Sequence, residues 1–342
     1  MDDTKGEYVM KKRVFITSIV VSILFVFTFL LAASWGSYSI SFGDVIKTFF
    51  GQGSLLQRTT IWDIRLPRIC VAIVVGVCLS TAGCVLQSVT RNELAEPGMI
   101  GINAGAAVAV VLLISYGSTS YYDTIGDVAL FVMPIAAIIG ALLSGFLIYF
   151  LSYKKGVSPT RLILTGIGVN VGINAFISLY QLNMSKGDYN QVLTWTSGSL
   201  WGSSWKFFWL VTPLVVIFLL LIMWKSKILD VLDLGDEIAT GLGVKVEKER
   251  RVLFFYAIVL AALATSVAGN IAFLGLLGPH IAKRLVGPVH RRQIPVAAGI
   301  SPVIIILADS ISRNAFSPIE VPAGIMIAIV GVPYFIYLML RE

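Results

Sequence analysis

Charged side chains are scarce in this 342-residue chain. They occupy 13% of positions, whereas hydrophobic residues make up 57%, and the mean hydropathy is +0.86. Soluble domains carry about 25% charged residues and interleave polar with apolar positions at helix or strand spacing. The composition therefore excludes an ordinary soluble domain and predicts an all-α polytopic membrane protein.

Cysteine and histidine are also rare, with three and two copies. Cys70, Cys78 and Cys84 share one apolar stretch, where a thiol acts as a small hydrophobe and predicts no disulfide framework. His280 and His290 have no cysteine nearby and lack the H-E-x-x-H spacing of a zinc site. We expect no metal site, no catalytic residues and no enzyme activity.

An internal energy source is missing as well. The chain lacks the G-x-x-x-x-G-K-[ST] loop that binds nucleotide phosphates. Ion-coupled carriers place carboxylates or histidines inside the helix bundle, but Asp309 is the only acidic residue within the predicted spans. Its four-residue spacing to Arg313 favours an ion pair instead. No segment resembles a channel filter or a ring of like charge, so the energy is expected to come from another subunit.

The sequence contains many long apolar runs. Roughly 20 apolar residues cross a bilayer as a helix. The first run follows Lys11, Lys12 and Arg13 and exceeds the length of a signal-peptide core, so we interpret it as a retained span. The eighth is weak, because Gly278 and Pro279 interrupt it. The ten predicted spans are 14–34, 69–90, 98–116, 128–151, 162–181, 207–224, 252–269, 271–286, 294–311 and 322–339.

The basic residues predict the orientation. With the N-terminus inside, 19 of the 26 lysines and arginines fall in inner loops and tails, as the positive-inside rule requires. Removing the eighth span would reverse this bias, so the count favours ten spans with both termini in the cytoplasm. The net charge of +7 is dispersed among loops, which argues against a nucleic-acid partner.

Residues 234–251, "LGDEIATGLGVKVEKERR", carry eight charges in eighteen positions. They form the inner loop between spans six and seven. Asp236 and Glu237 begin a helical run that Gly241 and Gly243 break, and residues 244–251 are expected to form a second short helix. Two interpretations stand: a solvated connector whose charges set topology, or a docking element for a cytoplasmic partner.

Four stretches carry a family resemblance: "RLPRICVAIVVGVCLSTAGCVLQSVTRNELAEPGMIGINAGA" (65–106), "GDEIATGLGV" (235–244), "FLGLLGPHIAKRLVGPVHRRQIP" (273–295) and "VPAGIMIAIVGVPYFIYLML" (321–340). They resemble the membrane-spanning permeases of bacterial iron-siderophore and vitamin B12 ABC importers. The resemblance implies a single permease domain over 1–342, in the bacterial cytoplasmic membrane, that imports iron(III)-siderophore complexes. A cobalamin or haem permease is the alternative within this class, and an ion-coupled secondary transporter is the alternative outside it.

The same resemblance implies the partners. Such permeases pair with a second permease, identical or homologous, and with two ATPase subunits that use ATP and Mg²⁺. An extracytoplasmic binding protein delivers the ferric siderophore. No cofactor is expected on this chain itself.

Site residues follow position by position. The resemblance assigns ATPase coupling, within a coupling loop at 230–251, to Asp236, Glu237, Gly241, Leu242 and Gly243. It assigns binding-protein docking to Arg65, Arg68 and Arg313, and the cytoplasmic gate to Asn92, Leu94 and Thr160. Position 93 departs from the family pattern, with Glu in place of Pro. Asn170 and Asn174, one helical turn apart, are interpreted either as lining a polar pathway or as hydrogen-bonding between helices.

Overall fold

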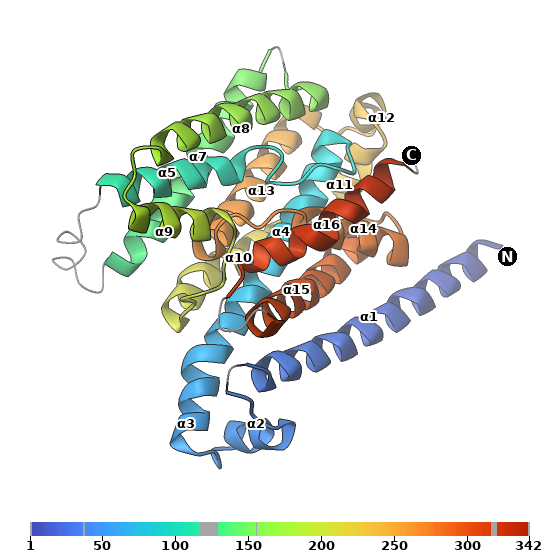
Figure 1. Ribbon diagram of the computed structural model, residues 1–342. Helices are drawn as coiled ribbons and strands as arrows, with labels where there is room; N and C mark the ends of the chain where they lie inside the picture. The colour runs from blue at the N-terminus through green and yellow to red at the C-terminus, as the bar shows by residue number, and fades with distance from the viewer. Residues whose placement is uncertain (1, 37, 117–128, 155, 316–319, 341–342) are drawn as a thin grey trace.

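The computed structural model describes residues 2–36, 38–116, 129–154, 156–315 and 320–340. Within these ranges the regular structure is helical (Figure 1). The helices are α1 (Asp2–Ser34), α2 (Phe42–Phe49), α3 (Leu55–Arg58), the π-helix η1 (Thr59–Arg65), α4 (Leu66–Thr90), α5 (Ile102–Tyr116), α7 (Ala129–Ser152), α8 (Pro159–Gln181), α9 (Lys186–Thr196), α10 (Trp205–Trp224), α11 (Ser226–Asp233), α12 (Asp236–Gly241), α13 (Val246–Ala268), α14 (Leu274–Val286), α15 (His290–Ala315) and α16 (Ala323–Met339).

A helix stands at each of the ten places where the sequence predicts a span. Seven helical segments are long and apolar enough to cross a membrane. The helices α5, α14 and α16 are shorter, at 15, 13 and 17 residues. The second span begins earlier than predicted, because α3 and η1 continue into α4 as one segment over Leu55–Thr90.

The predicted interruption of the eighth span at Gly278 and Pro279 is wrong, because α14 runs without a break from Leu274 to Val286, and the break lies before it, between α13 and α14. Gly269 and Phe273 both adopt positive φ, 69° and 64°, so the backbone leaves the helix and re-enters it five residues later. Irregular backbone at this depth must be enclosed by protein. Asn103 Nδ2 donates a hydrogen bond to Asn270 Oδ1 at 2.8 Å, which satisfies a polar side chain inside the break.

The helix α4 forms the core of the bundle. In its most apolar stretch 83% of the residues are buried, against 6% in α1. It packs against α13, α14 and α15. Cys78 and Cys84 are fully buried free thiols among its side chains, in agreement with their predicted role as small hydrophobes.

Backbone contacts fix the position of α4. A Cβ atom at Gly83 would overlap the carbonyl oxygen of Gly275 in α14, and one at Gly76 would overlap the backbone of Pro302 in α15. Small residues allow membrane helices to approach this closely. Substitution of either glycine would force two helices apart.

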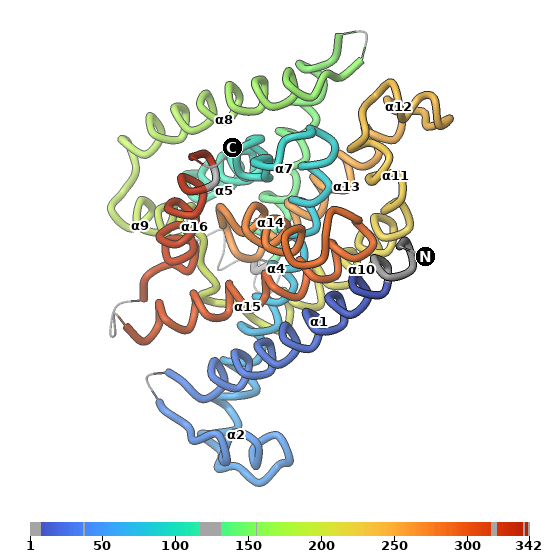
Figure 2. The backbone as a smooth tube through the Cα atoms, turned by 90° about the vertical axis from the view of Figure 1, so that its right-hand side faces the viewer, coloured from blue at the N-terminus to red at the C-terminus, as the bar shows by residue number. Residues whose placement is uncertain are grey.

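The helices α1, α8 and α10 lie at the periphery, where apolar side chains face outward. The first turn of α1, the last turn of α16 and the short helix α12 lie towards the right-hand side of Figure 1, which faces the viewer in Figure 2. The first turn of α1 and the last turn of α16 therefore lie on the side of the bundle that carries the charged loop.

Candidate coupling and gate region

Two glycines define the short helix α12. Gly235 and Gly243 have φ values of 114° and 82°, a region that glycine enters without steric cost. They turn the chain sharply before and after α12. The predicted helix at 236–241 is confirmed, whereas the predicted second short helix over 244–251 is wrong, because Val246 begins the long helix α13. The pair of short helices consists instead of α11 and α12.

Aliphatic side chains are exposed on α12 and at both of its ends. Ile238 is 53% exposed and Leu242 is 62% exposed, while Ala239 is fully buried against the bundle. Leu234, just before α12, is 57% exposed. Exposed aliphatic side chains that cluster outside the predicted spans mark an interaction surface.

Asp236, the first residue of α12, is held by two arginines. Arg250 Nη2 donates to its Oδ1 at 2.7 Å, and Arg91 Nη2 donates to the same oxygen. Arg91 Nε also donates to the Leu232 carbonyl at 3.1 Å. Arg250 is 4% exposed and donates to the Val157 carbonyl at 3.0 Å. The start of α12 is therefore linked to the end of α4, to α13 and to the segment before α8.

The predicted gate residues Asn92 and Leu94 lie in one turn after α4. Arg91 ends that helix in the left-handed conformation, with φ of 48°, and the Leu94 N–H donates to Asn92 Oδ1 at 2.8 Å. Thr160 lies exposed at the start of α8. In the part of the chain that the structure describes, no hydrogen bond joins Thr160 to this turn.

Glu93 ties the turn to α14. Lys283 Nζ donates to Glu93 Oε1 at 2.7 Å, and His280 Nδ1 lies 3.9 Å from Glu93 Oε2. The hydrogen bond from Lys283 lowers the pKa of the Glu93 carboxyl. The residue that departs from the family pattern thus has an ionic partner on a neighbouring helix.

Glu96, three residues further on, is buried. Burial raises its pKa to about 7, although a hydrogen bond from the Phe273 backbone opposes the shift. Desolvation penalises the charged form of a carboxyl more than one hydrogen bond compensates. This carboxyl therefore titrates near neutral pH beside the break between α13 and α14.

His290 joins three helices. Its backbone N–H donates to Asp230 Oδ1 at 2.8 Å, its Nδ1 lies 2.7 Å from the same oxygen, and its Nε2 lies 2.6 Å from Ser88 Oγ. The order Ser–His–Asp resembles a hydrolase triad, but Ser88 and His290 are buried. The group instead fastens α11 to α4 and α15. His290 is the first residue of α15.

Asn170 and Asn174 form a short chain of hydrogen bonds. Asn174 Nδ2 donates to Asn170 Oδ1 at 2.7 Å, and Asn170 Nδ2 donates to the Gly98 carbonyl at 3.2 Å. Asn170 therefore bonds α8 to the segment before α5, while Asn174 lies exposed on α8. Asn170 fits the interpretation as an interhelical contact, and the exposure of Asn174 is compatible with a pathway surface.

Arg65 is used inside the chain. It is 4% exposed, and its Nη1 donates to the Ser34 carbonyl at 2.9 Å. The carbonyls of Ala33 and Tyr38 also accept hydrogen bonds from its guanidinium. A cation at the C-terminus of a helix satisfies free carbonyls and complements the helix dipole. In this structure Arg65 closes the end of α1.

Arg68 and Arg313 share one carboxylate. Arg68 donates to both oxygens of Asp309, at 2.8 Å from Nη2 and 3.0 Å from Nε, and its Nη1 donates to Glu320 at 3.1 Å. Arg313 Nε lies 3.2 Å from Asp309 Oδ2. The predicted ion pair between Asp309 and Arg313 is confirmed. Arg65 takes no part in this cluster, so the three predicted docking arginines do not form one group.

Sequence reasoning missed the partners of the coupling and gate residues. Arg91, Arg250 and Lys283 were counted only as basic residues of the cytoplasmic side, and His290 was considered only as a metal ligand. Their one sequence signal is that each lies at a predicted span end, where an ionic partner on another helix is within reach. Among the described residues, no cluster of three or more His, Cys, Asp or Glu side chains is suited to a metal ion.

Comparison with known proteins gives consistent results. The model of the FecCD transport family matches residues 24–341. The iron(3+)-hydroxamate import system permease protein of Bacillus subtilis (strain 168) is 47% identical over 324 residues, which cover 94% of this chain and 96% of that protein. A probable siderophore transport system permease protein of the same organism is 39% identical and covers 98% of this chain and 97% of its own length.

A solved structure shows the same fold. It is an inward-facing conformation of a putative metal-chelate type ABC transporter, with a TM-score of 0.82 and 27% sequence identity. The match covers 95% of this chain and 98% of that one. Together with the long apolar helices, these relatives identify a multi-pass protein of the bacterial plasma membrane.

Proposed function

The chain belongs to the FecCD transport family, and we propose that it is the permease subunit of an ATP-driven importer that moves iron(III)-siderophore complexes into the cytoplasm. The names of the relatives support the substrate class, since they include permeases for iron(3+)-hydroxamate and siderophores. The observation that carries the mechanism is α12, which presents Ile238 and Leu242 outward on a helix whose first residue is tied into the bundle.

The proposed energy path starts in separate ATPase subunits. Two ATPases use ATP and Mg²⁺, and each permease of a pair seats its α12 in one ATPase. Leu242 fills an apolar site there, while Glu237 remains available to a basic side chain. Asp236 passes the movement to α4 and α13 through Arg91 and Arg250. A Cβ atom at Gly241 or Gly243 would have no neighbour within 4 Å and would project into open space. The two glycines therefore leave Leu242 without a protruding side chain on either side.

The proposed topology has ten spans with both termini in the cytoplasm. The helix positions and the bias of basic residues support it, with α5, α14 and α16 as short spans enclosed by their neighbours. The permease pairs with a second copy or a homologue, and residues 1–342 act as one domain. Residues 230–251, on the cytoplasmic side, form the coupling loop.

Substrate delivery falls to an extracytoplasmic siderophore-binding protein. Arg68 and Arg313 lie at the proposed outer end of the bundle, and acidic residues of the binding protein would compete with Asp309 and Glu320 for them. Arg65 contributes indirectly, because its hydrogen bonds to the last carbonyls of α1 hold the start of α4 against that helix. On the inner side the turn of Asn92 and Leu94, together with Thr160, forms the gate, and Asn174 faces the pathway.

The first test concerns Leu242. Replacing it with arginine removes an apolar contact worth about 1.5–3 kcal/mol, so retention of the ATPase during purification should fall by at least about tenfold. Uptake of a labelled ferric hydroxamate by iron-limited cells should fall with it. The matched control is Leu182→Arg, since Leu182 is also an exposed leucine but directly follows the last residue of α8, far from α12 in the chain. Normal ATPase retention and uptake in Leu242→Arg would contradict the proposal.

A further inference from the structure

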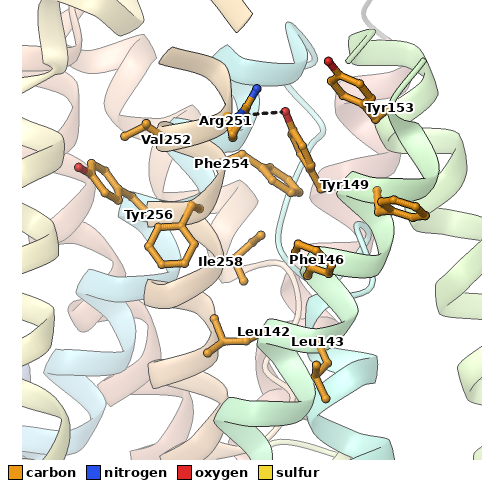
Figure 3. A pocket seen from close by; sticks show the side chains of 13 residues that line it. Leu142, Leu143, Phe146, Tyr149, Tyr153, Arg251, Val252, Phe254, Tyr256 and Ile258 are labelled. Carbon is orange, nitrogen blue, oxygen red and sulfur yellow. Dashed lines mark hydrogen bonds between the residues drawn. The ribbon is translucent and has the colours of Figure 1, made fainter. Parts of the chain in front are cut away.

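An apolar groove runs along the outside of the bundle between α7 and α13. Its volume is about 890 Å³, within the range of about 300–1,000 Å³ that is usual for small-ligand sites. Leu142 and Leu143 lie at one end, and Tyr149, Tyr153 and Arg251 lie at the other (Figure 3). The groove therefore has an apolar body and a polar end.

The floor of the groove depends on one glycine. A Cβ atom at Gly145 would lie 2.7 Å from Ile258 Cδ1, so the absence of a side chain lets α7 approach α13. Phe146 and Phe255 stand exposed along the walls. Exposed apolar rings on a membrane helix are suited to contact acyl chains.

Arg251 lies exposed at the polar end. Its Nε donates to Tyr149 Oη at 3.2 Å, which orients the guanidinium across the mouth of the groove (Figure 3). In the described part of the chain, no carboxylate lies within ion-pair distance of Arg251. Glu247, four residues earlier, attracts this guanidinium but is ion-paired with Arg250 instead.

A second hollow continues from this end and shares Arg251. Its two carboxylates, Asp236 and Glu247, are both in ion pairs with Arg250, so the remaining cations give it a positive field. Six basic residues line it: Lys154, Arg161, Lys245, Lys248, Arg250 and Arg251. This end lies where α7 finishes and α13 begins, on the side that carries α12.

We propose that the groove between α7 and α13 binds an anionic phospholipid of the cytoplasmic leaflet. One acyl chain lies along Phe146 and Leu143, and the phosphate accepts hydrogen bonds from the Arg251 guanidinium and the tyrosine hydroxyls. Arginine suits this position because its planar fork matches phosphate geometry and its stem can extend along the membrane interface. The charge match at Arg251, together with the basic hollow beyond it, selects an anionic headgroup over a zwitterionic one.

Native mass spectrometry of the full chain tests this site. The purified protein is titrated in detergent with dioleoyl-phosphatidylglycerol or dioleoyl-phosphatidylcholine, which share the same acyl chains. A single basic contact at a membrane surface corresponds to about fivefold in binding, so the wild type should retain phosphatidylglycerol at least about fivefold better. Arg251→Gln should bring the ratio close to one and leave phosphatidylcholine binding unchanged.

Two further variants separate the headgroup contact from the groove. Arg291→Gln removes an equally exposed charge at the start of α15 and should leave the preference intact. Leu143→Trp fills the groove and should reduce binding of both lipids. An unchanged lipid preference in Arg251→Gln overturns the proposal. So does normal lipid binding by Leu143→Trp with conversion of dimers to monomers, because a second copy of the chain would then occupy the groove.

Discussion

Glu93 Oε1 accepts a hydrogen bond from Lys283 Nζ at 2.7 Å, which joins the turn after α4 to the last turn of α14. Both side chains are partly exposed, and exposed pairs contribute only about 0–1 kcal/mol to stability. The contact therefore has more influence on which arrangement of the turn is populated than on whether the protein folds.

A charge exchange tests the importance of that contact for transport. Glu93→Lys places two like charges together and should lower siderophore uptake several-fold, with a change in unfolding free energy of about 1 kcal/mol or less. The double variant Glu93→Lys with Lys283→Glu should recover most of the uptake, as a double-mutant cycle requires of a direct pair. If the double variant transports no better than the single one, the pair does not position the turn.

Asp236→Asn should uncouple ATP hydrolysis from transport. The substitution weakens two charge-assisted hydrogen bonds and leaves the buried Arg250 without its carboxylate from α12, at a cost of about 1–3 kcal/mol. We expect ATP hydrolysis by the purified complex to persist while uptake into vesicles falls by about tenfold. Asp188→Asn, at the start of α9, is the matched control. Equal losses of hydrolysis and uptake would indicate that Asp236 serves ATPase binding alone.

Arg65→Gln should destabilise the protein rather than only weaken docking. Three backbone carbonyls would lose a charged donor, and hydrogen bonds to charged groups contribute about 1.5–3 kcal/mol each at most. The expected result is a lower thermal midpoint in detergent and less protein in the membrane. Arg68→Gln offers the comparison, since its guanidinium bonds to carboxylates. If the thermal midpoint of Arg65→Gln is unchanged, the position of α1 does not depend on the hydrogen bonds of Arg65.

Stability should fall as pH rises through neutrality because of Glu96. Its folded pKa is about 7 against an ordinary value of 4.5, so between these values the folded state binds more protons than the unfolded state. The resulting contribution is complete below about pH 4.5, decreases as pH rises to about 7, and amounts to at most about 3 kcal/mol. Thermal unfolding from about pH 5 to about pH 8 measures it. Glu96→Gln should flatten this dependence, and an identical slope in the variant would refute the assignment.

The Asp309 cluster separates the ATP-driven importer from an ion-coupled carrier. Asp309 is paired with both Arg68 and Arg313, so its carboxylate is already engaged by side chains of this chain. In vesicles with ATP inside, uptake should continue after an ionophore dissipates the ion gradients. Asp309→Asn should reduce stability but keep that ionophore resistance. Uptake that stops with the gradient would favour the carrier.

Periodicity and charge placement predicted the main helices because apolar length and loop charge are local properties. They placed α12 at 236–241 and the Asp309–Arg313 pair at four-residue spacing. They did not predict the early start of the second span, since Leu55 to Arg65 contains polar residues that a hydropathy pattern assigns to a loop. The left-handed backbone conformation of Phe273 was also not predicted from the sequence, because tertiary packing imposes it.

The site was predictable only in part, because its contacts join residues that are far apart in the sequence. Asp236 and Leu242 were found by resemblance, but the partners of Asp236 lie 145 and 14 residues away in sequence. Glu93 was identified as an unusual residue, and only the folded chain reveals Lys283 beside it. Similarly, Arg65 and Arg68 are three residues apart, yet one reaches α1 and the other α15. Short sequence spacing does not determine which neighbour a long side chain reaches.

The glycine contacts of α4 limit how this protein can move. At Gly83 and Gly76 its backbone touches α14 and α15 without intervening side chains, so sliding of one helix past another would cause immediate overlap. Packed interfaces of this kind shift as rigid bodies. We expect α4, α14 and α15 to travel as one block during transport. The bending is then expected at the borders of this block, such as the segment 91–101 that directly follows α4, so that the turn proposed as the gate also serves as a hinge of a single moving part.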